Sequence, residues 1–522
     1  MAVAQTSKEA KSFIAQPRSA AAPLAGASLI ILIAAYLAVV WAPIIGAEIT
    51  VAATAMAILV ADWFLPKEQQ AKLGLLGIFG LMAAIGVVIG GRMSGFEPSD
   101  AFSGMFVNSG FSTLFRLMIM GSGALAITMS LDYVGRRIAQ SGEYYALMVL
   151  AILGGMLLAA ANEMVTFYLA LELVSIPSYV LVSLRKREAR SSEAGLKYLI
   201  FGGISSAFLL YGFSWVFGMT GTTDFAAVGM AISQTGVNPP LVFAMCLCIA
   251  GVLYKISAAP FHMWTPDVYE GAPLPVTAFL SVTSKMAGTA ALLKLLGVPF
   301  SSGQLETRWV LMIAILSAVT MTIGNLIALA QRNIKRLFAY SSIAQGGYLM
   351  VGMTAAYRPD TLNAGLESVA FYLITYAFMN LGAFAVMLYV GREQDSAELS
   401  AYAGLAKRAP WSAAILSLCL ISLAGLPPLA GFMGKFYLFG AAVKAGFTWL
   451  AVIGVLNSVV SLYYYVAIIK TMYFGELADA KPFAPPAAGI ALALGLSAAG
   501  VVGLFLFPSP LLTMITNFVS NM

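Results

Sequence analysis

The sequence predicts an all-α polytopic membrane protein with about 15 transmembrane helices. Of its 522 residues, 60% are apolar and only 10% are charged, whereas soluble domains carry about 25% charged residues. Apolar runs recur from about residue 24 to residue 507, and a run of about 20 residues can cross a bilayer. The runs do not alternate apolar with polar residues, so the strands of a membrane β-barrel are excluded.

The apolar runs divide into fifteen spans, with boundaries good to about four residues. In chain order they cover 24–45, 48–65, 73–91, 112–133, 144–160, 162–183, 195–218, 241–265, 274–297, 309–330, 337–356, 367–391, 411–440, 449–474 and 486–507. The first run is longer than the core of a signal peptide, about 7–15 residues, so we interpret it as a retained span. The run at 411–440 is long enough to contain a break.

The basic residues in the loops support this count. With the N-terminus in the cytoplasm, 18 lysines and arginines fall on the inside and only four on the outside, namely Arg92, Arg308, Arg358 and Lys444. This asymmetry is the positive-inside pattern, and a shift by one span destroys it. It predicts a cytoplasmic N-terminus and an outside C-terminus. It also explains the net charge of +6 without nucleic acid, for which the chain lacks a basic patch interleaved with aromatics.

The sequence offers no site for a cofactor. Cys246, Cys248 and Cys419 all lie in apolar spans, form no CxxC pair, and are expected to be small core side chains. The single histidine, His262, excludes a bis-histidine haem and a copper or iron site built on several histidines. We therefore expect no cofactor or metal in this chain, and expect the electrons of any associated redox system to travel through other subunits.

A weak internal repeat relates two halves of the chain. The segment EAGLKYLI, which starts at Glu193, resembles ESVAFYLI, which starts at Glu367, 174 residues later; the pairs at 250–251 and 424–425 match at the same offset. An offset of five spans inverts the second copy in the membrane. Inverted repeats of this kind are typical of transporters, whose broken helices mark the ion path.

Glu172 is a carboxylate in the middle of the span 162–183. A charge in the hydrocarbon layer costs about 2.5–3.5 kcal/mol on the insertion scale, so a partner or a function is expected. Lys197 in the next span is a candidate partner. A static ion pair that fixes helix packing is the alternative to a role in proton transfer.

Lys255 and Lys435 each accompany a proline break. Lys255 precedes Pro260, which frees the carbonyl of Ile256, and Lys435 follows Pro427-Pro428, whose missing hydrogen bonds free the carbonyls of Leu423 and Ala424. Freed carbonyls can solvate an ammonium group at membrane depth, and a buried lysine readily changes its protonation state. Lys285 lies in the middle of its span in SVTSKMAG and is expected to connect the two sites.

Other polar residues are less decisive. His262 could shuttle protons or simply form hydrogen bonds at a helix end. Asp267 and Glu270 are expected in a cytoplasmic loop, where they line a proton uptake path, face water or contact a partner. The neighbouring aromatics, Phe261, Trp264 and Tyr269, most simply form an interfacial belt. Lys294 and Lys470 lie near span ends and are expected to snorkel.

Five motifs resemble the antiporter-like subunit N of respiratory complex I, the family that includes the chloroplast and mitochondrial counterparts of this subunit. They read LVSIPSYVL, PFHMWTPDVYEGAP, SKMAG, RNIKRLFAYSSIAQGGYL and SLAGLPPLAGFMGKFYLF. The resemblance extends from about residue 48 to residue 510. It implies a 14-helix core with two inverted five-helix repeats, each with a broken helix. The span at 24–45 precedes the usual first helix and departs from the family pattern.

The resemblance implies a domain organisation, partners and site residues. The chain divides into a cytoplasmic tail (1–23), an extra helix (24–45), N-terminal helices (46–140), a first repeat (141–300), a second repeat (301–475) and a C-terminal helix (476–522). The family's proton path falls on Glu172, Lys197, Lys255, Lys285 and Lys435, all of the expected types, with His262 as a further candidate. The implied setting is the bacterial inner membrane. The implied partners are the lipid bilayer and subunits M, L, K, J, A and H, with quinone, flavin and iron-sulfur clusters in partner subunits.

Three functional hypotheses follow. The first is a proton-translocating membrane-arm subunit of a complex I-type NADH-quinone oxidoreductase. The second is a subunit of an Mrp-type sodium/proton antiporter, a secondary transporter from the same superfamily; the wording HMWTPDVYEGAP favours subunit N. The third is a membrane scaffold whose lysines are static.

Overall fold

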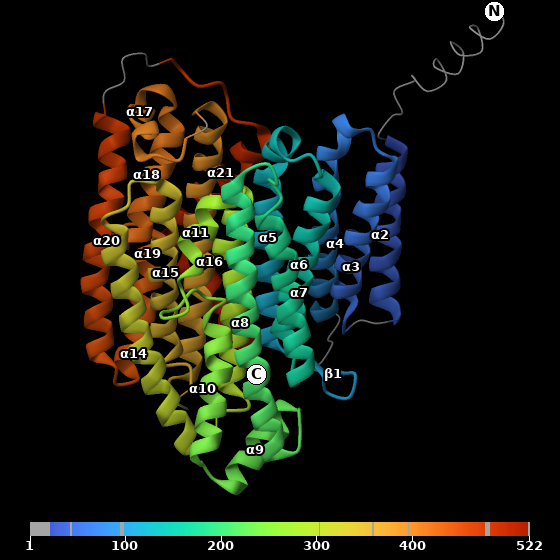
Figure 1. The fold of residues 1–522 in the computed structure, drawn as a ribbon, viewed down its shortest axis with the longest axis vertical. Coiled ribbons are helices and arrows are strands. Elements are labelled where there is room, and N and C mark those ends of the chain that lie inside the picture. The colour runs from blue at the N-terminus through green and yellow to red at the C-terminus, as the bar shows by residue number, and fades with distance from the viewer. Residues whose placement is uncertain are drawn as a thin grey trace, which may run out of the picture.

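The structure is a bundle of long helices that run roughly side by side (Figure 1). It is a computed structural model that describes residues 21–41, 44–93, 99–301, 303–357, 360–394, 396–475 and 481–519. Most of the expected N-terminal tail, residues 1–20, lies outside the described residues. Helix α9 and the β1 hairpin lie at one end of the bundle and α17 lies at the other (Figure 1).

The N-terminal part is a group of helices that starts with the extra helix. It comprises α2 (Ala21–Trp41), α3 (Gly46–Phe64), the 3₁₀ helix η1 (Lys67–Lys72), α4 (Leu73–Met93), strands β1 (Ser99–Ala101) and β2 (Phe106–Asn108), and α5 (Gly110–Arg137). Helix α2 packs on α3 and α4. The strands pair antiparallel, with Asp100 opposite Val107.

A buried ion pair joins α3 to α5. The Arg116 guanidinium lies 2.6 Å from the Glu48 carboxylate, and both side chains are almost fully covered. Arg116 also donates to the Asn108 side chain, at 3.0 Å. Removal of one partner from such a pair leaves an uncompensated buried charge, which costs about 3–5 kcal/mol, so this pair holds the N-terminal helices in register.

The middle of the chain forms two successive sets of helices. The first set is α6 (Ser141–Ala160), α7 (Met164–Val182), α8 (Ala189–Thr220), α9 (Phe225–Thr235), α10 (Pro239–Leu253), α11 (Trp264–Gly271), α12 (Leu274–Phe279), the π-helix η2 (Leu280–Ser284) and α13 (Lys285–Gly297). The second set is α14 (Gly303–Ala328), α15 (Ile334–Met353), α16 (Leu362–Gln394), η3 (Leu399–Tyr402), α17 (Leu405–Arg408), α18 (Pro410–Ala424), α19 (Ala430–Lys444) and α20 (Thr448–Phe474). Helices α21 (Ala488–Leu506) and α22 (Pro508–Val519) follow.

The all-α membrane fold is confirmed. Among the described residues, eleven helices are long and apolar enough to cross a membrane, and shorter apolar helices accompany them. The count of fifteen spans stays a prediction. The short helix α9 and the β1–β2 hairpin were not expected from the sequence, because each lies in a segment that was assigned to a connection. Helix α22 lies after the last predicted span and was not expected as a separate helix.

Both expected helix breaks are present, and one differs in position. Helix α18 ends at Ala424 and α19 begins at Ala430, around Pro427-Pro428 as predicted. Helix α10 ends at Leu253, seven residues before Pro260. Lys255 therefore lies inside the break, and the expectation that it lies within the helix is wrong. Helix α10 cannot continue to Pro260, because Ser257 adopts a positive φ of 61°, which a helix cannot accommodate.

Candidate functional site: a buried row of lysines

Lys435 is solvated by the carbonyl groups that the second break releases. It lies on α19, and its ammonium nitrogen donates to the Leu423 and Ala424 carbonyl oxygens, both at 3.0 Å, and to the Ser458 hydroxyl at 3.0 Å. The same nitrogen lies 4.3 Å from the centre of the Tyr348 ring. The side chain is 3% exposed. The sequence-based prediction of these two carbonyls as its ligands is confirmed.

Lys285 lies at the centre of the bundle, where the continuous span formed by α12, η2 and α13 changes from π-helix to α-helix. A π-helical turn inserts an extra residue and often marks a functional site. The Lys285 ammonium group donates to the carbonyl oxygen of Ser342 on α15 and faces the Tyr376 ring at 5.9 Å. Its side chain is 1% exposed, so its polar contacts are made entirely inside the protein.

Lys255 lies in the first break and points toward α7. Its ammonium group donates to the Ser175 hydroxyl at 3.0 Å, and the side chain is 3% exposed. The stem of Lys255 packs on Gly288 of α13, where an added Cβ would lie 3.0 Å from its Cγ atom. Ser175 is one helical turn after Glu172 on α7, so the lysine and the carboxylate share one stretch of this helix.

Glu172 is partly buried, and its carboxylate accepts a hydrogen bond from the Ser206 hydroxyl of α8. The candidate pair of Glu172 with Lys197 is not among the ion pairs of the described residues. Lys197 instead bridges the carboxylates of Asp267 and Glu193, each at 2.7 Å. The reason is position: Lys197 is close to the beginning of α8, nine residues before Ser206, which is about 13 Å along a helix.

Asp267 and Glu270 lie in helix α11 rather than in a loop. Arg336 of α15 reaches both carboxylates, at 2.8 Å and 2.9 Å. Burial acts to raise the pKa of the Asp267 carboxyl, but the hydrogen bonds from Lys197 and Arg336 outweigh it and bring the pKa below its usual value. This network of charges ties α8, α11 and α15 together at one end of the bundle.

Two aromatic residues and one lysine contradict the sequence-based expectations. Trp264 and Tyr269 are 3% and 1% exposed, and Trp264 stacks on Tyr198 at 4.5 Å, so they form an aromatic core instead of an interfacial belt. Lys294 is 8% exposed and does not snorkel. Its span is fully covered by neighbouring helices, so its side chain has no route to the lipid interface. His262 is partly buried, and its Nδ1 has no partner among the described residues.

Polar groups of α15 lie between Lys285 and Lys435. Lys285 binds the carbonyl oxygen of Ser342, and Gln345 lies one turn later. The Gln345 amide donates to the Leu423 carbonyl at 3.5 Å, and Lys435 donates to that same oxygen. Tyr372 donates to the Gln345 side-chain oxygen. Buried hydrogen-bonding groups therefore lie along the stretch of α15 between the two lysines, and Gln345 and Lys435 share one acceptor, the Leu423 carbonyl oxygen.

The sequence analysis missed most of the residues that complete this row. Ser175, Ser206, Ser342, Gln345 and Ser458 supply the contacts described above. Serine and glutamine are common in membrane helices, so composition alone does not identify them. Gln345 was the easiest of these residues to identify from the sequence, because an amide in the middle of a span needs a buried hydrogen-bond partner.

A helix bundle with two interrupted helices and a buried lysine at each break is typical of an ion-translocating membrane protein. Residues 161–461 match the family described as "NADH:quinone oxidoreductase/Mrp antiporter, TM". The chain belongs to this family, and within it to the relatives of subunit N of NADH-quinone oxidoreductase.

The comparisons cover nearly the whole chain. It is 39% identical to the NADH-quinone oxidoreductase subunit N of Desulfitobacterium hafniense, over 92% of this chain and 98% of the relative. It is similar to a chain of respiratory complex I from Thermus thermophilus, with a TM-score of 0.75, 31% identity, and coverage of 90% of this chain and 98% of that chain. A chain of the Mrp complex from Dietzia sp. shares the fold, with a TM-score of 0.74 and 19% identity over 95% of this chain and 97% of that chain.

Proposed function

We propose that this chain is a proton-translocating membrane-arm subunit of a complex I-type NADH-quinone oxidoreductase, and that protons move along Lys255, Lys285 and Lys435. The observation that carries the proposal is the row itself. Each ammonium group is buried, and its hydrogen-bond acceptors are neutral oxygens of serines and carbonyl groups. A buried lysine with neutral ligands can exist with or without its extra proton, which a permanent ion pair would prevent.

The contacts suggest how protonation passes along the row. An ammonium group gives a proton to the oxygen of a neighbouring hydroxyl or water, which passes one of its own protons onward in the same step. The resulting neutral amine then accepts the next proton. Between Lys285 and Lys435 the Gln345 amide of α15 and the Tyr372 hydroxyl of α16 supply the polar surroundings. Each proton moved against 100 mV costs about 2.3 kcal/mol, so the driving energy comes from redox chemistry in other subunits.

Glu172 and Lys197 regulate uptake in this proposal. The basic loops assign the α11 end of the bundle to the cytoplasm, and protons are taken up there near Lys255 and Lys285. Glu172 lies one turn from the ligand of Lys255, so a change in its charge alters the protonation of that lysine. Release is to the outside, through Lys435 or through a neighbouring subunit, and His262 is a secondary candidate for the path.

The wider setting is also proposed. The redox centres (quinone site, flavin and iron-sulfur clusters) belong to partner subunits, and this chain carries none. The partners are the antiporter-like subunits M and L and subunits K, J, A and H. The membrane is the bacterial inner membrane, with the N-terminus in the cytoplasm and the C-terminus outside. Among the described elements, the extra helix α2 packs on α3 and α4. In this proposal it also contacts a neighbouring subunit or lipid.

An Mrp-type sodium/proton antiporter subunit is the second candidate. The shared fold supports it, but identity is 19% to the Mrp chain and 31% to the complex I chain. Sodium-dependent proton exchange by membranes that carry this chain, in the absence of NADH oxidation, would favour the antiporter.

The deciding experiment is Lys255→Ala in the assembled complex, reconstituted into liposomes. We expect quinone-linked proton pumping to be lost while the complex still assembles. Lys470→Ala is the matched control, because Lys470 is an exposed lysine in α20. Full pumping by the Lys255→Ala complex would disprove the proposed path.

A further inference from the structure

A cavity lies at the α11 end of the bundle and is not part of the lysine row. Its volume is about 490 Å³, which is within the usual range of ligand sites. Six basic side chains from different elements line it: Arg136, Arg137, Arg185, Arg190, Lys335 and Arg392. Three carboxylates also line it: Asp132, Glu188 and Glu270. The described lining therefore has an excess of three positive charges.

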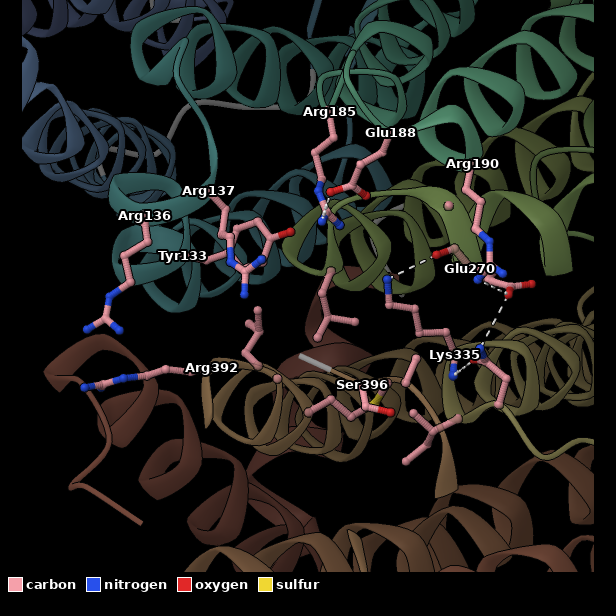
Figure 2. A pocket seen from close by; sticks show the side chains of 18 of the residues that line it. Tyr133, Arg136, Arg137, Arg185, Glu188, Arg190, Glu270, Lys335, Arg392 and Ser396 are labelled. Carbon is pink, nitrogen blue, oxygen red and sulfur yellow. Dashed lines mark hydrogen bonds and ion pairs between the residues drawn. The ribbon is translucent and has the colours of Figure 1, made fainter. Parts of the chain in front are cut away.

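The arginines come from both halves of the molecule. Arg136 and Arg137 are in the last turn of α5, Arg185 is in the turn between α7 and α8, and Arg392 is in the last turn of α16. Figure 2 shows the guanidinium groups of Arg136 and Arg392, which project from facing helices, toward the same end of the cavity, with Arg137 and Tyr133 beside them. A ligand in this position would contact α5 and α16 together.

The ion pairs of Arg136, Arg185 and Arg392 at the cavity are made with carboxylates close in the sequence. Arg136 pairs with Asp132 one turn earlier, at 3.1 Å, and Arg185 pairs with Glu188 in its own turn. Arg392 pairs with the adjacent Glu393 at 3.5 Å. The Arg136 side chain is 51% exposed, and exposed pairs of this kind contribute little stability. The Arg136 guanidinium group can therefore turn to an incoming anion at low cost.

At the other end of the cavity one carboxylate, Glu270, lies among two of the basic side chains, Arg190 and Lys335. Arg190 reaches the Glu270 carboxylate at 3.4 Å, and Lys335 donates to the Glu270 and Ala272 carbonyl oxygens at 3.1 Å and 3.3 Å. Figure 2 shows these groups joined by dashed lines on the side away from Arg136. Of the excess of three positive charges, two therefore lie at the end with Arg136, Arg137, Arg185 and Arg392, where Asp132 and Glu188 are the lining carboxylates.

We propose that this cavity binds a phosphate group, from the headgroup of an anionic phospholipid or from a soluble phosphate ester. Arginine forms paired hydrogen bonds with phosphate oxygens and is preferred over lysine for that purpose. Apolar side chains also line the cavity, among them Leu274, Met387 and Ile490, which suit the glycerol and upper acyl region of a lipid. Basic pockets between membrane helices on the cytoplasmic side commonly bind such headgroups.

The test uses the purified complex in nanodiscs of phosphatidylcholine with or without a tenth of diphosphatidylglycerol, and compares two double variants. Arg136→Gln with Arg392→Gln removes two charges from the cavity. Lys186→Gln with Arg187→Gln removes the same charge from the turn between α7 and α8, at residues that do not line the cavity. Bound phospholipid is counted by mass spectrometry after delipidation in detergent, and binding of radiolabelled inorganic phosphate is measured in parallel.

We expect the Arg136/Arg392 variant to retain about tenfold less anionic lipid or phosphate than the wild type, while the Lys186/Arg187 variant retains the wild-type amount. Loss of lipid alone identifies a headgroup site, and loss of inorganic phosphate identifies a soluble ester site. Equal retention by both variants and the wild type would overturn the proposal. Thermal melts of both variants are recorded without added anion, to separate a binding defect from a folding defect. The proposal requires that the Arg136/Arg392 variant melts at the wild-type temperature while it retains less anionic lipid or phosphate.

Discussion

The ammonium nitrogen of Lys435 lies 3.0 Å from the carbonyl oxygen of Leu423, twelve residues earlier in the chain. This carbonyl is released because a proline break removes the amide that would bind it within the helix. A backbone carbonyl group of the second broken helix therefore binds the buried ammonium group. It also connects Lys435 to Gln345, which donates to the same oxygen, and so to the rest of the row.

Substitutions at Lys435 and at Ser458 distinguish the role of the buried cation from that of its ligands. We expect Lys435→Met to abolish proton pumping by the reconstituted complex, because no titratable group then remains at the second break. Ser458→Ala leaves both carbonyl ligands in place and should lower the pumping rate by less than about tenfold, equivalent to 1.4 kcal/mol. The measurement is the rate of NADH-driven acidification of proteoliposomes. A pumping Lys435→Met complex would show that protons bypass this residue.

Gly346 is predicted to be intolerant of any side chain. A Cβ at this position would lie 2.7 Å from the Ile256 carbonyl oxygen in the first break and 3.7 Å from the Lys285 nitrogen. Overpacking of this kind costs about 1–3 kcal/mol, and a backbone atom cannot turn aside. We expect Gly346→Ala to impair pumping strongly, as measured by proton flux per NADH oxidised.

Gly203→Ala is the matched control for that substitution, since a Cβ there meets no atom within 4 Å. Normal flux in both variants would mean that the first break is free to move away from α15.

The charge of Glu172 is tested by a substitution that keeps its shape. Glu172→Gln preserves an acceptor for the Ser206 hydroxyl but removes the negative charge one turn from the ligand of Lys255. We expect a fall in pumping of about tenfold or more, equivalent to 1.4 kcal/mol. Ser206→Ala keeps the charge and should have a smaller effect. If Ser206→Ala pumps more slowly than Glu172→Gln, the hydrogen bond rather than the charge is what matters at this position.

The α11 network is predicted to lose stability in acid. The pKa of Asp267 in the folded protein lies below its usual value because Lys197 and Arg336 donate to the carboxylate against the opposing effect of burial. A carboxyl group whose pKa is lower in the folded protein than in the unfolded chain stabilises the fold at pH values above its unfolded pKa, about 3.9. That stability is lost as the pH falls through the pKa of the folded protein. The side chains are one third exposed, so each pair contributes only about 0.2–1 kcal/mol.

The measurement is the thermal midpoint of the purified chain in detergent between pH 7 and pH 3. Asp267→Asn should lower the midpoint at pH 7 and flatten its fall in acid. Glu143→Gln, in the first turn of α6, controls for loss of a carboxylate elsewhere. An Asp267→Asn midpoint equal to that of the wild type at pH 7 would contradict the prediction.

Sequence and structure agree where the determining physics is local. Apolar runs predicted the membrane helices because desolvation of the backbone permits little else in a bilayer. The break around Pro427-Pro428 and the carbonyl ligands of Lys435 followed from the i to i−4 hydrogen-bond pattern alone. The first break was placed seven residues too late, since the turn at Ser257 depends on its packing and not only on Pro260.

The tertiary structure decided which residues meet. The sequence determined the fold class, the two interrupted helices and the buried lysines, because each is set by the cost of a charge or a missing hydrogen bond within one span. It could not determine that Lys197 pairs with Asp267, 70 residues away, or that Lys294 and Trp264 are covered. Partners and burial depend on how helices pack against one another, and many sequence-distant pairings are compatible with the same pattern of spans.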